Sequence, residues 1–127
     1  MPTDSPPQIS DKSMGKDSLT LLKGTLDVLI LKSLSWAPLH GYAVSRWIRQ
    51  TTDDVLEVQE GVLYPALHRL ERRGLVQSEW GRSDTNRKVK YYELTEQGEA
   101  RLAAQGNDWS RYATAMDKVL GATERPR

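Results

Sequence analysis

The stretch EGVLYPALHRLERRGL, residues 60–75, decides the fold. Its apolar residues recur at helical spacing and gather on about a third of a helical wheel: Leu63, Ala66, Leu67 and Leu70. Pro65 is compatible with a helix that begins close to Glu60–Val62, because a proline in the first turn removes an N–H that has no partner within the helix. Gly74 supplies a glycine stop. The stretch therefore predicts a short helix with one face in the core.

The opposite side of this predicted helix carries hydrogen-bond donors, cations and an aromatic ring. It consists of Tyr64, Pro65, His68, Arg69 and Arg72. Such groups reach base edges and phosphates when a helix enters the major groove of DNA. The alternative is an ordinary solvated face, since many surface helices carry arginines.

Two further helices are predicted before this one. Residues 18–37 read as a helix that is apolar around most of its circumference, including Leu22 and Leu26. A helix of this kind is buried on more than one side, which favours a second surface given to a partner subunit. Pro38 ends it, and a second helix begins near Gly41.

A hairpin is predicted after Gly74, because two alternating runs flank the polar loop GRSDTNRK. Its tip is basic and contains Arg82, Arg87, Lys88 and Lys90. A basic hairpin next to a basic-faced helix favours contact with a nucleic-acid backbone or minor groove. Three helices followed by a hairpin give the layout of a winged helix-turn-helix.

The last predicted helix starts at Thr95, the expected N-cap. Leu102, Trp109 and Met116 recur at seven-residue intervals, a pattern typical of helices that pack on other helices. The predicted dimer interface comprises Leu22, Leu26, Leu102, Trp109, Tyr112, Met116 and Leu120. The alternative is a helix that folds back on its own domain.

Trp109 would lie near the axis of such a dimer. Its ring is a candidate to line a pocket for an aromatic ligand, and the alternative is that it is a packing residue.

Charge and composition limit the functions that the chain can have. The net charge is +1, yet the segment from Arg69 to Lys90 holds seven basic and three acidic residues. This basic edge fits a phosphate-binding surface. The chain has no cysteine and two histidines, so we expect no disulfide, no metal site and no cofactor. We see no nucleophile–base pair, and we do not expect an enzyme.

The domain organisation follows from these elements. We expect a disordered extension at 1–18, a winged helix-turn-helix domain at 19–94, a dimerisation helix at 95–121 and a disordered tail at 122–127. The fold class is mostly α with a small β-hairpin. No run approaches the ~18 apolar residues of a membrane span, and the N-terminus lacks the apolar core of a signal peptide, so a cytoplasmic protein is expected.

Three segments together resemble the PadR family of transcriptional regulators: LLKGTLDVLILKSLSWAPLHGYAVSRWI, GVLYPALHRLERRGLV and KYYELTEQGEARL. The resemblance runs from about Leu19 to Leu120 and fits the smaller size class of the family, with one C-terminal helix. Val62 departs from the pattern, because a Ser or Thr cap is expected there. The resemblance implies a dimeric winged-helix repressor that often loses DNA affinity when a small effector binds. In some short members a tryptophan at the position of Trp109 stacks on flat aromatic compounds.

Residue pattern and resemblance lead to one hypothesis. The chain is a sequence-specific DNA-binding regulator, a homodimer that binds an inverted-repeat operator in double-stranded DNA and is released by a small aromatic effector. The alternative is a winged-helix protein-interaction module without DNA binding.

Overall fold

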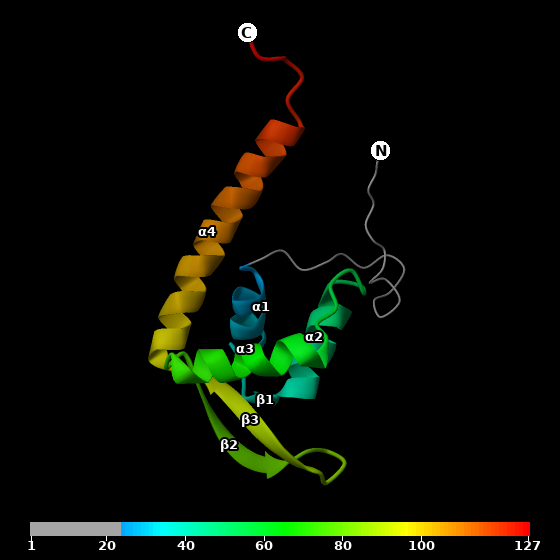
Figure 1. Cartoon of the computed structure of the whole chain (residues 1–127), viewed down its shortest axis with the longest axis vertical. Helices are drawn as coiled ribbons and strands as arrows, with labels where there is room; N and C mark the ends of the chain where they lie inside the picture. The colour runs from blue at the N-terminus through cyan, green and yellow to red at the C-terminus, as the bar shows by residue number, and fades with distance from the viewer. Residues whose placement is uncertain (1–23) are drawn as a thin grey trace.

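The computed structural model describes residues 24–127 of the chain. Three helices and a small sheet form a body, and a long fourth helix runs along one side of the body and past it (Figure 1). The elements in order are α1 (Leu26–Ser33), β1 (Leu39–His40), α2 (Gly41–Thr51), α3 (Glu60–Arg72), β2 (Val76–Arg82), β3 (Lys88–Leu94) and α4 (Glu96–Leu120). The predicted winged helix-turn-helix, mostly α with a β-hairpin, is confirmed.

Helix α1 is shorter than the sequence predicted. It spans Leu26–Ser33, whereas residues 18–37 read as one helix. Gly24 has a φ of +87°, a left-handed conformation that a right-handed helix cannot contain. The predicted helix was also wrong after Ser33, where the chain leaves the helix ahead of Pro38. The predicted disordered extension, 1–18, and Leu22 lie outside the described residues.

The sheet has one strand more than predicted. Strand β1 pairs antiparallel with β3 through Leu39 opposite Tyr92 and His40 opposite Tyr91, and the strand order is β1-β3-β2. A two-residue strand is too short to show alternation in the sequence. The hairpin itself, β2 with β3, was predicted correctly.

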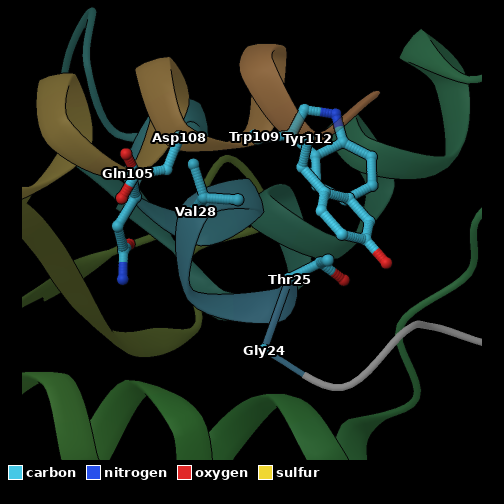
Figure 2. Close-up of a pocket in the computed structure, with 7 residues that line it drawn as sticks. All are labelled: Gly24, Thr25, Val28, Gln105, Asp108, Trp109 and Tyr112. Carbon is cyan, nitrogen blue, oxygen red and sulfur yellow. The ribbon is translucent and has the colours of Figure 1, made fainter. Parts of the chain in front are cut away.

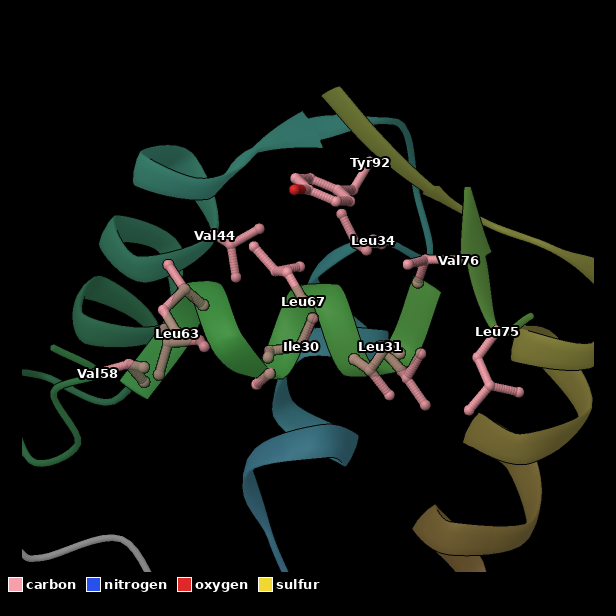
Figure 3. Close-up of a cluster of buried hydrophobic side chains, with 13 residues drawn as sticks. Ile30, Leu31, Leu34, Val44, Val58, Leu63, Leu67, Leu75, Val76 and Tyr92 are labelled. Atoms are coloured by element: carbon pink, nitrogen blue, oxygen red, sulfur yellow. The ribbon is translucent and has the colours of Figure 1, made fainter. Parts of the chain in front are cut away.

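Helix α3 lies at the centre of the core (Figure 3). Its four predicted core residues, Leu63, Ala66, Leu67 and Leu70, are all at most 1% exposed. Side chains from the other elements surround it: Ile30 and Leu31 of α1, Val44 and Ile48 of α2, and Tyr92 of β3. With its inner face fixed in this way, α3 has its remaining faces turned away from the core.

The end of α3 and the start of α4 are held together. Gly74 has a φ of +78°, and the next N–H, that of Leu75, donates to the Leu70 carbonyl at 3.0 Å, so the glycine stop is confirmed. Thr95 is the N-cap of α4, as predicted: its Oγ1 accepts from Gly98 N at 3.0 Å and donates to the Gly74 carbonyl at 2.7 Å. These bonds fix the direction in which α4 leaves the body.

Helix α4 continues without interruption through residues 105–108, despite their weak helix-forming character. Among the helices described, none has the length and apolar character required to cross a membrane.

Candidate nucleic-acid interface

A groove of about 760 Å³ lies between α2, α3 and the hairpin. Its wall has donor-bearing, basic and aromatic side chains from all three elements: Tyr42, Arg46, Tyr64, His68, Trp80, Arg87, Lys88 and Lys90. The fold therefore brings Tyr64 and His68 of α3 to the same groove as part of the basic hairpin. Four other predicted contact residues are not among those that line it: Pro65, Arg69, Arg72 and Arg82.

The sequence LHGY, residues 39–42, builds one wall of this groove. The His40 Nδ1 accepts a hydrogen bond from Ala43 N at 3.3 Å and caps α2. A Cβ on Gly41 would lie 2.6 Å from the ring of Tyr64, so glycine at this position leaves room for that ring. Tyr42 is 57% exposed, and the Arg46 guanidinium stands 5.2 Å from the centre of its ring.

Tyr64 lies on the outward face of α3, and its ring also contacts Gly41 of α2. Burial raises the pKa of its hydroxyl, and the Glu60 carboxylate raises it further. Both effects favour the protonated phenol, which can donate a hydrogen bond. Because 36% of the residue is exposed, its ring packs on Gly41 while part of it still faces the groove.

The basic residues of α3 have different surroundings. The Arg69 guanidinium forms an ion pair of 2.9 Å with Asp27 of α1, and Arg73 approaches the other oxygen of the same carboxylate at 3.6 Å. Pro65, His68 and Arg72 are exposed. Arg72 forms no ion pair with a residue of the described chain. Arg69, expected at the DNA, thus has its charge engaged within the body.

The hairpin loop is internally braced. Asn86 has a φ of +63°, and Ser83 N donates to the Arg87 carbonyl at 2.9 Å. The Arg82 guanidinium donates to the Asn86 carbonyl at 3.3 Å. The loop is therefore a shaped projection that presents Arg87 and Lys88 to the solvent.

Sequence reasoning missed Tyr42, Arg46 and Trp80 as members of the groove. Tyr42 is 57% exposed and Trp80 is 60% exposed, and neither is part of the basic face or basic hairpin tip that the sequence indicated. Arg46 follows Tyr42 by one helical turn, so the polar side of α2 was the available signal.

A second hollow, of about 470 Å³, lies between α1 and α4 (Figure 2). On the α1 side its walls are formed by the N-cap residue Thr25 and by Val28. On the α4 side they are formed by Gln105, Asp108, Trp109 and Tyr112. The two aromatic rings lie 5.9 Å apart and form one side. The Gln105 Oε1 is buried and has no hydrogen-bond partner within the described residues.

The residues predicted at a dimer interface divide into two groups. Leu26 and Leu102 are partly buried against the core of their own chain. Trp109, Tyr112, Met116 and Leu120 are between 40% and 76% exposed, and Val119 is 73% exposed beside them. Among the predicted interface residues that the structure describes, those that are exposed therefore all lie in the second half of α4. The described part of the chain holds no cluster of three or more histidine or acidic side chains that suits a metal ion.

A helical core, a recognition-type third helix and a basic hairpin define a winged-helix DNA-binding protein. The Transcriptional regulator PadR-like family matches residues 30–104, more than half of the chain. The chain belongs to this family of transcriptional regulators.

Solved structures agree with this assignment. A transcriptional regulator from Clostridium thermocellum is 30% identical, with a TM-score of 0.68 over 76% of this chain and 93% of that chain. A PadR family regulator from Clostridium difficile is 28% identical, with a TM-score of 0.67 over 76% and 99%. A PadR-like regulator from Bacillus cereus is 28% identical, with a TM-score of 0.68 over 79% of this chain and 95% of that chain.

A relative is also found by sequence. A protein of Lysinibacillus sphaericus is 27% identical over 104 residues, which are 82% of this chain and 95% of that protein.

Proposed function

We propose that the chain is a dimeric repressor that binds an inverted-repeat operator in double-stranded DNA. One observation carries this proposal: Tyr64 and His68 of α3 border the same groove as three hairpin cations, and none of these cations forms an ion pair with a carboxylate of the described chain. The three cations are Arg87, Lys88 and Lys90. Membership of a transcriptional regulator family supports DNA as the partner.

The proposed contacts divide by role. Tyr64, Pro65, His68 and Arg72 lie on the part of α3 that would face the major groove, where side-chain donors read base edges. The hairpin would hold the flanking backbone by phosphate contacts. Its cations are Arg82, Arg87, Lys88 and Lys90. Arg69 is better placed to position α3 than to contact DNA, because Asp27 engages its charge.

The proposed partner subunit is a second copy of the chain. The exposed apolar side chains of α4 lie C-terminal to Leu102, which packs against the core of its own chain, so a copy related by a two-fold axis would cover them. Two α3 helices would then face successive major grooves, with half-site centres ~10 bp apart or a multiple of that.

The test is selection of bound duplexes from a random pool, followed by affinity measurements over a range of salt concentrations. We expect an inverted repeat to be enriched, with log Kd depending steeply on log salt concentration. Absence of duplex binding at low salt would support the alternative, a protein-interaction winged helix.

The hollow between α1 and α4 is the proposed effector site. Trp109 and Tyr112 offer aromatic faces, while Gln105 Oε1 and the Asp108 carboxylate offer acceptors. A flat aromatic compound that carries hydrogen-bond donors fits this lining. Because the hollow lies between α1 and α4, a bound compound would shift one helix against the other and change the separation of the two α3 helices in a dimer.

A variant with Trp109 as its only tryptophan tests this site. Trp36, Trp47 and Trp80 are replaced by Phe, and flat aromatic compounds with and without amino groups are titrated. A true effector quenches Trp109 emission and also weakens operator binding, by about 5–150-fold for typical coupling. Quenching without a change in operator affinity would contradict the effector role.

A further inference from the structure

The largest side chain on the groove side of the hairpin is Trp80. It lies on β2 directly opposite Lys90 of β3, and Ser78 is paired in the same way with Tyr92. Because alternate residues of a strand share a face, Trp80 continues the face on which Tyr92 is buried in the core. Beyond the core, that face becomes the wall of the groove.

The two aromatic residues near the hairpin tip are used differently. Tyr91 points to the other face, where its ring covers Gly81 and its hydroxyl donates to the Arg82 carbonyl at 2.8 Å. Tyr91 therefore stabilises the hairpin itself. Trp80 has no such role, since it is 60% exposed and absent from the core cluster.

Two ammonium groups flank the Trp80 ring. The Nζ of Lys88 lies 5.0 Å from the ring centre and that of Lys90 lies 5.6 Å from it. At an exposed site each contact contributes little stability, so the arrangement is a weakly held cluster of one flat apolar surface and two cations. A nucleic-acid strand offers the complement, namely apolar sugar faces between regularly spaced phosphates.

We propose that Trp80 is a DNA-contact residue whose ring packs on the deoxyribose of the strand that Lys88 and Lys90 hold by its phosphates. This proposal rests on the proposed function and adds an apolar contribution to DNA binding beside the ionic contribution of the lysines. Phosphate contacts release counterions and depend on salt, whereas packing of the ring on a sugar releases none. The wing would therefore bind DNA with a salt-dependent part, from the lysines, and a salt-independent part, from Trp80.

The test compares Trp80→Ala with Trp36→Ala in binding to a duplex of random sequence. Trp36 is a matched control, because it is 68% exposed and has the Lys32 ammonium 4.5 Å from its ring, but it lies outside the groove. We expect Trp80→Ala to weaken binding about 10-fold at every salt concentration, with an unchanged salt slope. Trp80→Phe should restore most of the affinity, and Trp36→Ala should bind as the wild type does. Lys88→Ala should instead lower the slope by roughly one unit.

A fluorescence measurement makes the test independent of the Ala variants. With Trp36, Trp47 and Trp109 replaced by Phe, the emission of Trp80 should change in intensity and wavelength as duplex is added. Unchanged emission at saturating DNA would overturn the proposal, and so would wild-type affinity in Trp80→Ala. A salt slope that falls together with affinity in Trp80→Ala would also overturn it, since the ring would then only position the lysines. If the wild type binds no duplex, the proposed function itself fails.

Discussion

The body of the molecule and its two projections use the same kinds of residue in different ways. The body comprises α1, α2, α3 and the base of the sheet, and the projections are the second half of α4 and the tip of the hairpin (Figure 1). In the body, the core side chains pack on one another, and Arg69 and Arg73 pair with Asp27. In the projections, Met116 and Leu120 of α4 and Arg87 and Lys88 of the hairpin are exposed to solvent.

The apolar stripe of α4 shows the difference along one helix. Leu102 and Met116 belong to the same seven-residue repeat. Leu102 packs against the core of its own chain, whereas Met116 is 40% exposed. The seven-residue repeat alone therefore does not show which residues form an interface. The distance of each residue from the body indicates whether its own chain covers it.

The basic residues show the same contrast. Arg69 and Arg73 share the carboxylate of Asp27, and all three lie in the body. Arg87 and Lys88 at the hairpin form no ion pair with a residue of the described chain. A cation that is not paired with a carboxylate can bind a phosphate without first breaking an ion pair. The hairpin is therefore better suited than the body to bind a phosphate backbone.

The largest expected effect is at the start of α4, where the helix joins the body. A Cβ on Gly98 would overlap the Leu75 carbonyl oxygen, so Gly98→Ala must push the helix away. We expect a loss of about 3 kcal/mol in the free energy of unfolding, measured by urea denaturation. Gly106→Ala is the matched control in the same helix, because nothing lies near that Cβ, and it should stabilise by about 1 kcal/mol. Equal stabilities for the two variants would mean that α4 does not need this close contact.

The next effect concerns the uncovered half of α4. Met116→Asp combined with Leu120→Asp should raise the dimer dissociation constant at least ~100-fold, because two carboxylates would lose their hydration in an apolar interface. Sedimentation equilibrium measures this change, and the helix signal in circular dichroism should persist in the monomer. Leu102→Ala should behave differently and lower stability, since Leu102 packs on the body. A double variant that remains a dimer would place the interface elsewhere.

The core of the fold was predictable from the sequence because it depends on local pattern. The wheel of α3 identified Leu63 and Leu67 as core residues, and the cap at Thr95 followed from its position before a helical run. Strand β1 was not predictable, because its two residues acquire their structure only by pairing with β3. The start of α1 was missed because the spacing of the apolar residues around Gly24 does not show that this glycine adopts a left-handed conformation.

The candidate site was predictable in outline only. The basic hairpin and the face of α3 were found from charge and periodicity, and the structure places parts of both at one groove. The role of Arg69 was not visible, because its partner Asp27 is 42 positions away in the sequence. The place of Trp80 in the groove was not visible either, because a single tryptophan in a strand does not show from sequence whether its ring is buried or exposed.

A smaller effect tests the hairpin projection. Arg87→Ala with Lys88→Ala should weaken binding to all duplexes alike, because phosphate contacts carry no sequence information. The slope of log Kd against log salt concentration should fall by roughly one unit for each lost contact, or about two in total. Titrations at several salt concentrations measure it. An unchanged slope would show that the hairpin tip does not contact phosphate.

The smallest effect separates the two arginines of α3 and tests whether the contrast between body and projections extends to single charges. Arg69→Ala removes an ion pair in which the arginine side chain is 44% exposed, so it should lower the free energy of unfolding by less than about 1 kcal/mol. The loss should shrink in high salt. It should leave the salt slope of DNA binding unchanged, since Asp27 engages that charge. Arg72→Ala should do the reverse: it should lower the slope by roughly one unit with little change in stability, because Arg72 is exposed and has no ion-pair partner among the described residues. If instead Arg69→Ala lowers the slope as much as Arg72→Ala does, the phosphate backbone draws Arg69 away from Asp27, and α3 contacts DNA along both of its basic edges.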